Sequence, residues 1–259
     1  MTDLHTPPVN DGDLFSERAR QYALEKPLQR IHILEAGCGW GTGLDLGDRR
    51  CHVMGVDMEA PELRAHTCER PDLDTWHLGD LRTAPLPPRA YDLVHASYLI
   101  ERVPHAELVL DRFVAALKPG GLLLVRLRDR NTAFGYLDRT LPRWLHASGR
   151  HAGQRSGDRS GGHRRRRPLR AVSRTGPPPA IYDRVASRSG MRWYCAMRGL
   201  VICEEYTSRW AVEARGAGTR LAALLYPLVS ALSRGRLTAD HSEITLVIRK
   251  PENRFARVI

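Results

Sequence analysis

The residues best suited to binding chemistry form one short run, in which Glu35 is followed by Gly37, Gly39 and Gly41. The run ends the apolar segment 31–35, which has the composition of a buried strand. Glycines at every second position remove the Cβ atoms that would hold a ligand away from the backbone, and they leave amide N–H groups facing it. A ligand is therefore expected to lie against this bend, at the carboxyl end of a strand.

The spacing of these glycines excludes two common cofactor motifs. The dinucleotide motif GxGxxG needs a glycine three residues after its second one, but Thr42, Leu44 and Leu46 occupy the positions in question. A phosphate-binding loop needs Gly-Lys followed by Ser or Thr, which is absent as well. The remaining pattern is an acid followed by three alternating glycines.

The elements that must position this bend alternate between strand and helix. Apolar runs predict strands at 31–35, 51–56, 76–78, 91–96, 121–127, 200–205 and 243–249. Helical spacing predicts helices at 14–25, 42–48, 104–117, 189–197 and 219–233. Such alternation implies a mostly parallel sheet covered on both faces. Residues from about 131 to 187 show no sustained period.

Residues 35–41 resemble motif I of the class I S-adenosylmethionine-dependent methyltransferases. Three later features follow in the family's order, namely Asp57, the run Gly79-Asp80-Leu81, and the segment from Tyr91-Asp92-Leu93-Val94 to Lys118-Pro119-Gly120-Gly121. The resemblance covers residues 31–130. It implies an α/β fold, a three-layer αβα sandwich with a seven-stranded, mostly parallel Rossmann-like sheet and an antiparallel last strand.

The resemblance also implies S-adenosylmethionine as cofactor. It places Asp57 on the ribose hydroxyls and Asp80 on the exocyclic amine of adenine. The expected cofactor-binding residues are Glu35, Gly37, Gly39, Gly41, Asp57, Met58, Asp80 and Leu81. A simpler interpretation of each acid, as a cap for backbone N–H groups at the end of a strand, stays open.

Catalytic residues are not assigned by the sequence, and no metal site is expected. Many relatives carry Glu-His-Val after the fourth strand where this chain has Glu101-Arg102-Val103, so no role of that histidine can be transferred. A hydroxyl acceptor would need a general base, and His95 and His105 stand near the carboxyl end of the fourth strand. A buried structural histidine and a solvated one are the simpler interpretations. Ser97 and Tyr98 are expected to shape the pocket.

The leading function hypothesis is methylation of a small or lipid-like molecule. Two alternatives stay open: methylation of RNA, and a non-catalytic module that binds the cofactor. The apolar, basic-flanked helix at 219–233 fits core packing, a lid over the acceptor, or peripheral contact with a membrane surface. The oligomeric state is not assigned.

The formal net charge of +11 is concentrated in one stretch. Residues 143–174 contain ten arginines and one acid. Three interpretations compete for residues 146–175: a solvated insertion over the acceptor site, a binder of RNA phosphates that lacks aromatic residues for base stacking, or the product of a frameshift in a G+C-rich gene.

The expected organisation is an N-terminal helical segment (1–30), a cofactor-binding core (31–130), an Arg/Gly-rich insertion or cap (131–187) and the rest of the same sheet with an inserted apolar helix (188–259). Five cysteines without metal-ligand spacing, no recognisable signal peptide and no long apolar run favour a cytoplasmic location.

Overall fold

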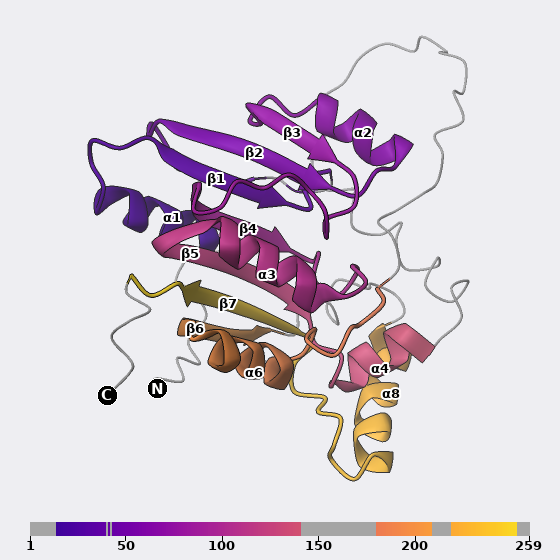
Figure 1. Cartoon of the computed structure of the whole chain (residues 1–259). Helices are drawn as coiled ribbons and strands as arrows, with labels where there is room; N and C mark the ends of the chain where they lie inside the picture. Colours follow the sequence, from indigo (N-terminus) through magenta and orange to yellow (C-terminus); the bar gives the residue numbers. More distant parts are fainter. Residues whose placement is uncertain (1–13, 40, 42, 141–179, 209–218, 253–259) are drawn as a thin grey trace, which may run out of the picture.

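The computed structural model describes residues 14–39, 41, 43–140, 180–208 and 219–252 (Figure 1). Its centre is a seven-stranded sheet with the order β3-β2-β1-β4-β5-β7-β6. Strands β1 to β5 are parallel to one another, whereas β7 is antiparallel to both β5 and β6. The predicted fold class is therefore confirmed, including the antiparallel last strand.

The strands follow the apolar runs of the sequence closely. They are β1 (Ile31–Ala36), β2 (Cys51–Asp57), β3 (Thr75–Leu78), β4 (Tyr91–Ser97), β5 (Leu117–Arg128), β6 (Val201–Ser208) and β7 (Glu243–Arg249). The four central strands β1, β4, β5 and β7 are buried along almost their whole length. Because β1, β2, β3 and β4 run in parallel, their carboxyl ends lie along one edge of the sheet.

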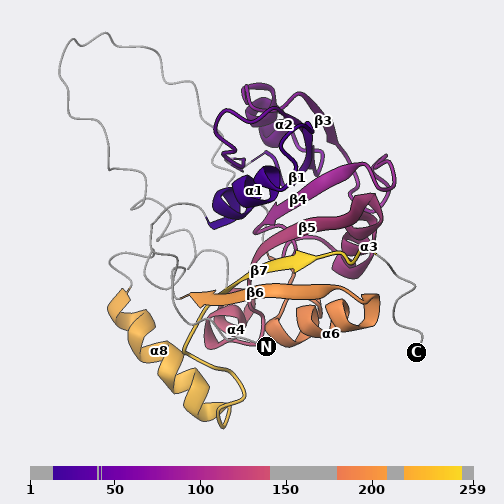
Figure 2. The same cartoon turned by 90° about the vertical axis from the view of Figure 1, so that its left-hand side faces the viewer.

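Helices cover both faces of the sheet. They are α1 (Leu14–Leu24), α2 (Pro61–Cys68), α3 (Ala106–Ala116), α4 (Ala133–Thr140), α6 (Arg188–Arg198) and α8 (Thr219–Leu232). Figure 2 shows α1 on one side of the sheet and α3 with α6 on the other. The two faces bury separate apolar clusters, centred on Phe113 of α3 and on Phe15 of α1.

Local chemistry explains where α6 begins and ends. The Ser187 side chain accepts a hydrogen bond from the Gly190 amide and so caps the first turn. Gly199 ends the helix in the left-handed region, at φ 64°. The predicted helix 189–197, with Gly199 as its end, is therefore confirmed with one more residue at each side.

Three sequence expectations about local structure are wrong. Residues 43–48 form no helix, because Gly43 and Gly47 adopt positive φ values of 74° and 62°. Strand β5 begins at Leu117 rather than at 121, since Tyr91 pairs with Leu117 across an irregularity in the register. Helices α2 and α4 were not expected at all.

Helix α8 packs on α4 rather than on the sheet. The ring centroids of Phe134 and Tyr226 are 6.0 Å apart, and Leu137 and Val229 pack beside them. Leu228 and Leu232 are more than half exposed, because the helix turns Tyr226 toward α4. The basic stretch 146–175 lies outside the described residues, and the expected division of the chain at 30, 130 and 187 stays a prediction.

Candidate cofactor site at the carboxyl edge of the sheet

The glycine bend lies between the carboxyl ends of β1 and β2. The Gly37 amide donates to Val56 O at 2.8 Å, which holds the start of the bend against β2. Two amides then converge on one carboxylate: Gly39 N donates to Asp57 Oδ2 at 2.9 Å, and Met58 N donates to Asp57 Oδ1 at 2.7 Å. The bend therefore faces the acid that the sequence singled out.

A side chain at the bend would collide with its surroundings. A Cβ atom at Gly41 would lie 2.6 Å from Glu35 Oε1, and one at Gly39 would lie 2.6 Å from Leu63 of α2. Gly37 adopts φ +85°, which disfavours any residue with a side chain. Backbone conformation therefore favours glycine at position 37, and a side chain at position 39 or 41 would displace Leu63 or Glu35.

Asp57 is almost completely buried, with 4% of its surface exposed. Burial raises the pKa of its carboxyl group, while the hydrogen bonds from the Gly39 and Met58 amides act in the opposite direction. A desolvated carboxylate held by two amides is a strong acceptor for neutral hydroxyl donors.

The other predicted residues occupy the same edge with different exposure. The Gly79 amide donates to Asp57 O at 2.9 Å, so the end of β3 is tied to the end of β2. Asp80 is exposed and forms an ion pair with Arg82 at 2.7 Å, and that guanidinium lowers the pKa of Asp80 to about 2. Leu81 is buried in the core below, where Met58 packs against the same cluster.

Glu35 connects the bend to the interior of the sheet. Its Oε1 faces the bend and lies 3.9 Å from Arg70, while its Oε2 lies 2.7 Å from His95 Nδ1. The second ring nitrogen of His95 lies 2.8 Å from Ser97 Oγ. Sequence reasoning missed this chain of contacts. Its only signal was a histidine at an inward-facing position of a buried strand.

A second buried acid lies beyond the end of β4. Glu101 is fully buried, and within the described part of the chain neither carboxylate oxygen has a hydrogen-bond partner. Its nearest cation is Arg102, at 4.0 Å. Burial raises the pKa of Glu101 to about 7. His105, the other candidate base, is exposed at the start of α3.

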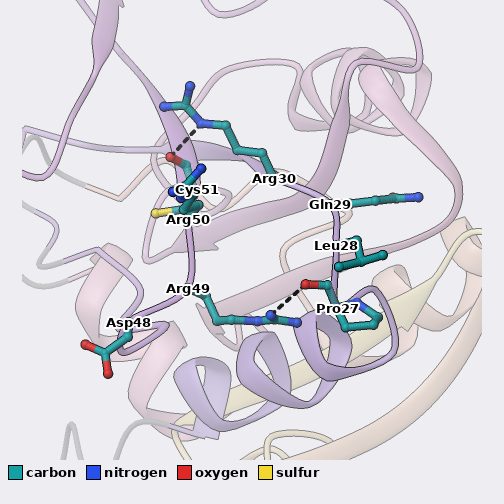
Figure 3. Close-up of a pocket in the computed structure, with 8 residues that line it drawn as sticks. All are labelled: Pro27, Leu28, Gln29, Arg30, Asp48, Arg49, Arg50 and Cys51. Atoms are coloured by element: carbon teal, nitrogen blue, oxygen red, sulfur yellow. Dashed lines mark hydrogen bonds between the residues drawn. The ribbon is translucent and has the colours of Figure 1, made fainter.

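An open depression lies at the opposite edge of the sheet, where β1 and β2 begin (Figure 3). Arg30 donates to Cys51 O at 3.0 Å, and Arg49 donates to Pro27 O at 2.9 Å. Both guanidinium groups therefore hold backbone carbonyls together. We assign this depression a structural role and place the functional site at the glycine bend.

Metal ligands and membrane-spanning helices are both absent from the described residues. No three His, Cys, Asp or Glu side chains among them come together as metal ligands. None of their helices combines the length and hydropathy that crossing a bilayer requires.

Comparisons with known proteins show which family the chain resembles. A family model described as a methyltransferase domain matches residues 12–171, more than half of the chain. The chain is 36% identical over 102 residues to a probable S-adenosylmethionine-dependent methyltransferase of Mycolicibacterium smegmatis, covering 39% of each protein. It is 30% identical over 115 residues to trans-aconitate 2-methyltransferase of Variovorax paradoxus, covering 43% of this chain and 44% of that one.

A mouse protein is similar over a comparable stretch. The mitochondrial ubiquinone biosynthesis O-methyltransferase of Mus musculus is 31% identical over 133 residues, which cover 48% of this chain and 35% of the mouse protein. The chain thus aligns with less than half the length of these curated relatives.

Solved structures support the fold. The 4+2 cyclase SpnF superposes with a TM-score of 0.52 at 17% identity, covering 96% of this chain and 87% of that one. A putative sarcosine dimethylglycine methyltransferase from Galdieria sulphuraria gives 0.50 at 13% identity, covering 96% and 92%.

The chain belongs to the class I S-adenosylmethionine-dependent methyltransferase family, and S-adenosylmethionine is its cofactor. The residues at the edge fit this molecule. The bend carries glycines at positions where a Cβ atom would press on Leu63 or Glu35, and a buried carboxylate, Asp57, accepts from its Gly39 amide. An adenosyl sulfonium compound carries ribose hydroxyls, and a buried carboxylate next to a glycine-rich bend at the end of a parallel strand is suited to accept from them.

Replacing Gly41 by alanine is expected to weaken S-adenosylmethionine binding about 10- to 100-fold, which corresponds to the usual 1–3 kcal/mol for overpacking. The new methyl group would press on Glu35 Oε1. Isothermal titration measures the loss. Gly47→Ala is the matched control, because no atom lies within 4 Å of its Cβ position and only its positive φ is disfavoured. Equal affinities in Gly41→Ala and the wild-type protein would contradict the close approach.

Proposed function

We propose that this protein transfers the methyl group of S-adenosylmethionine to a small molecule. The family supports the reaction, and the relatives whose names specify an acceptor act on trans-aconitate or in ubiquinone biosynthesis, which favours a small acceptor over RNA. The observation that carries the proposal is the pairing of the glycine bend with Asp57, through the 2.9 Å hydrogen bond between Gly39 N and Asp57 Oδ2.

In this proposal the residues at the edge divide the cofactor between them. Asp57 accepts from the ribose hydroxyls through the carboxylate lone pairs that its bonds to the Gly39 and Met58 amides leave free. Asp80 leaves Arg82 to accept from the adenine amine, which is inexpensive because that ion pair is exposed. Met58 and Leu81 provide apolar contact to the base, and the Gly37–Gly41 backbone faces the amino acid part.

The bound cofactor supplies a methyl group that its sulfonium already activates. The contribution of the chain is therefore to align the acceptor with that group and to exclude water. Ser97 and Tyr98 stand where β4 ends, beside the bend. Tyr98 adopts φ 54° and donates its hydroxyl to Glu243 at 3.0 Å, so this corner is held in a fixed conformation.

Titration with S-adenosylmethionine tests the cofactor site directly. Asp57→Asn is expected to weaken binding about 10- to 100-fold, since a hydrogen bond to a charged group contributes roughly 1.5–3 kcal/mol. The control is Glu59→Gln, two residues away, whose carboxylate forms only an exposed ion pair with Arg64. Undiminished binding by Asp57→Asn would remove the basis of the proposal.

The acceptor is identified with radiolabelled cofactor. Purified protein is incubated with pools of small metabolites, lipids and RNA, and transferred label is counted in each pool. Label in the metabolite pool alone is the expected result. Label in RNA alone would contradict the small-molecule assignment, and binding without transfer to any pool would indicate a non-catalytic module.

A further inference from the structure

A line of three polar side chains runs from the buried sheet to its carboxyl edge. Glu35 of β1 and His95 of β4 are register partners in adjacent parallel strands, so their side chains lie on the same face. Glu35 and His95 are both buried, and Ser97, two residues further along β4, is partly exposed. The line therefore joins the interior to the side where an acceptor would approach.

The contacts set the direction of each hydrogen bond. An ionised carboxylate can only accept, so Glu35 Oε2 accepts from His95 Nδ1–H at 2.7 Å. In the neutral ring this leaves a lone pair on Nε2, which accepts from the Ser97 hydroxyl at 2.8 Å. The serine oxygen keeps its own lone pairs for a further donor.

The surroundings hold the imidazole ring in place. Phe15 of α1 contacts it edge to face, with ring centroids 5.3 Å apart and planes at 74°. Two charged groups nearby are Arg70, 3.9 Å from Glu35, and Arg126, whose guanidinium lies over the Phe15 ring at 5.2 Å from its centroid. The ring is thus fixed by an acid on one nitrogen, a hydroxyl on the other and an aromatic edge.

We propose that Ser97, His95 and Glu35 form a proton relay that acts as the general base for a hydroxyl acceptor. This inference rests on the proposed methyl transfer and specifies its acceptor class. A hydroxyl must lose its proton when it is methylated, whereas a carboxylate acceptor is already ionised near neutral pH. A line of a buried acid, an imidazole and a hydroxyl can accept that proton, which a carboxylate acceptor does not need.

The transfer conserves atoms and electrons. The acceptor oxygen bonds to the methyl carbon while the carbon–sulfur bond breaks, with its electron pair going to sulfur. The acceptor proton passes to Ser97 Oγ, and the proton of Ser97 passes to His95 Nε2. Glu35 stays ionised and stabilises the imidazolium. After product release the proton returns through Ser97 to water. Ser97 is the catalytic residue that touches the acceptor, and Glu35 is a positioning residue for His95.

The relay has a readout in the protein without cofactor. Nitrogen NMR of the histidine rings is expected to show a protonated Nδ1 and an unprotonated Nε2 for His95. Ser97→Ala should shift only the Nε2 resonance, since it removes that hydrogen bond. A proton on Nε2, or an Nε2 resonance that Ser97→Ala leaves unchanged, would overturn the relay whatever the activity.

The kinetic test compares two probes, catechol for hydroxyl acceptors and trans-aconitate for carboxylates. Transfer to catechol is expected, and Ser97→Ala and His95→Gln should lower its kcat about 100-fold or more without changing cofactor affinity. His105→Asn, at an exposed histidine, is the control and should keep the wild-type rate.

Methylation of trans-aconitate alone, unaffected by Ser97→Ala, would overturn the hydroxyl assignment. If the protein did not bind the cofactor at all, the proposed function would be contradicted instead. The NMR measurement would still test the hydrogen bonds of the relay, because it needs no cofactor.

Discussion

Replacing Asp92 by alanine is expected to lower the free energy of unfolding by about 3 kcal/mol or more, as the removal of one partner from a buried charge network does. Asp92 lies in β4, and its side chain is 2% exposed. Its carboxylate accepts from the His32 amide at 3.0 Å, from Lys118 at 2.7 Å, and at longer range from Lys26 and Tyr22. One side chain thereby joins β1, β4 and β5 to helix α1 and the turn after it.

The pH dependence of this effect follows from the charge. Burial opposes ionisation of Asp92, but the Lys118 ammonium and the His32 amide outweigh it and hold its pKa below the usual range. The stabilisation is therefore present above the pKa of the unfolded chain, near 3.9, and is lost as the pH falls through the lower folded value. Chemical denaturation curves of wild type and Asp92→Ala should differ at pH 7 and converge in acid.

Glu59→Ala serves as the reference for this measurement. Its ion pair with Arg64 is about half exposed on both sides and should contribute roughly 1 kcal/mol or less. A loss in Asp92→Ala no greater than in Glu59→Ala would show that the network around Asp92 does not hold the sheet to α1.

The parts of the site that were predictable are those encoded by local spacing. The glycine bend and Asp57 could be recognised because three glycines and an acid at the end of a strand must stand in a fixed order along the chain. Strand β7 was predicted with its observed limits, Glu243–Arg249, because a buried central strand is a continuous apolar run. The fold class followed from the alternation of such runs with helical segments.

The parts that could not be predicted depend on contacts between distant residues. Glu35 and His95 meet because β1 and β4 are neighbours in a certain register, which the sequence does not state. Helix α2 has no clear apolar stripe and is fixed by the packing of Leu63 against the bend. The sequence shows that Asp80 is an acid at the end of a strand, but it does not show that Asp80 forms an exposed ion pair with Arg82.

Glu101 should behave in the opposite way to Asp92. Asp92 lies within β4 and Glu101 just after it, and both are buried acids. Asp92 has four hydrogen-bond donors, whereas Glu101 has none among the described residues. Burial raises the pKa of Glu101 to about 7, whereas its ordinary pKa is 4.5. Between these two pH values the carboxyl group keeps its proton in the folded protein and loses it in the unfolded chain. The stabilising contribution of the protonated form is complete below pH 4.5 and declines until the pH reaches about 7.

Glu101→Gln removes this titration. As the pH rises from 4.5 to 7.5, the free energy of unfolding of the variant is therefore expected to increase by about 3 kcal/mol relative to that of wild type. Each pH unit that separates the folded and unfolded pKa values contributes roughly 1.4 kcal/mol. Urea denaturation of both proteins across that range measures the difference, and the constant penalty of burying an amide cancels. A pH-independent difference would mean that Glu101 ionises freely in the folded protein. The expected slope would instead identify Glu101 as a carboxyl group whose ionisation destabilises the fold. It lies just after β4, on the side where the acceptor is proposed to bind, and ionisable groups with shifted pKa values cluster at functional sites.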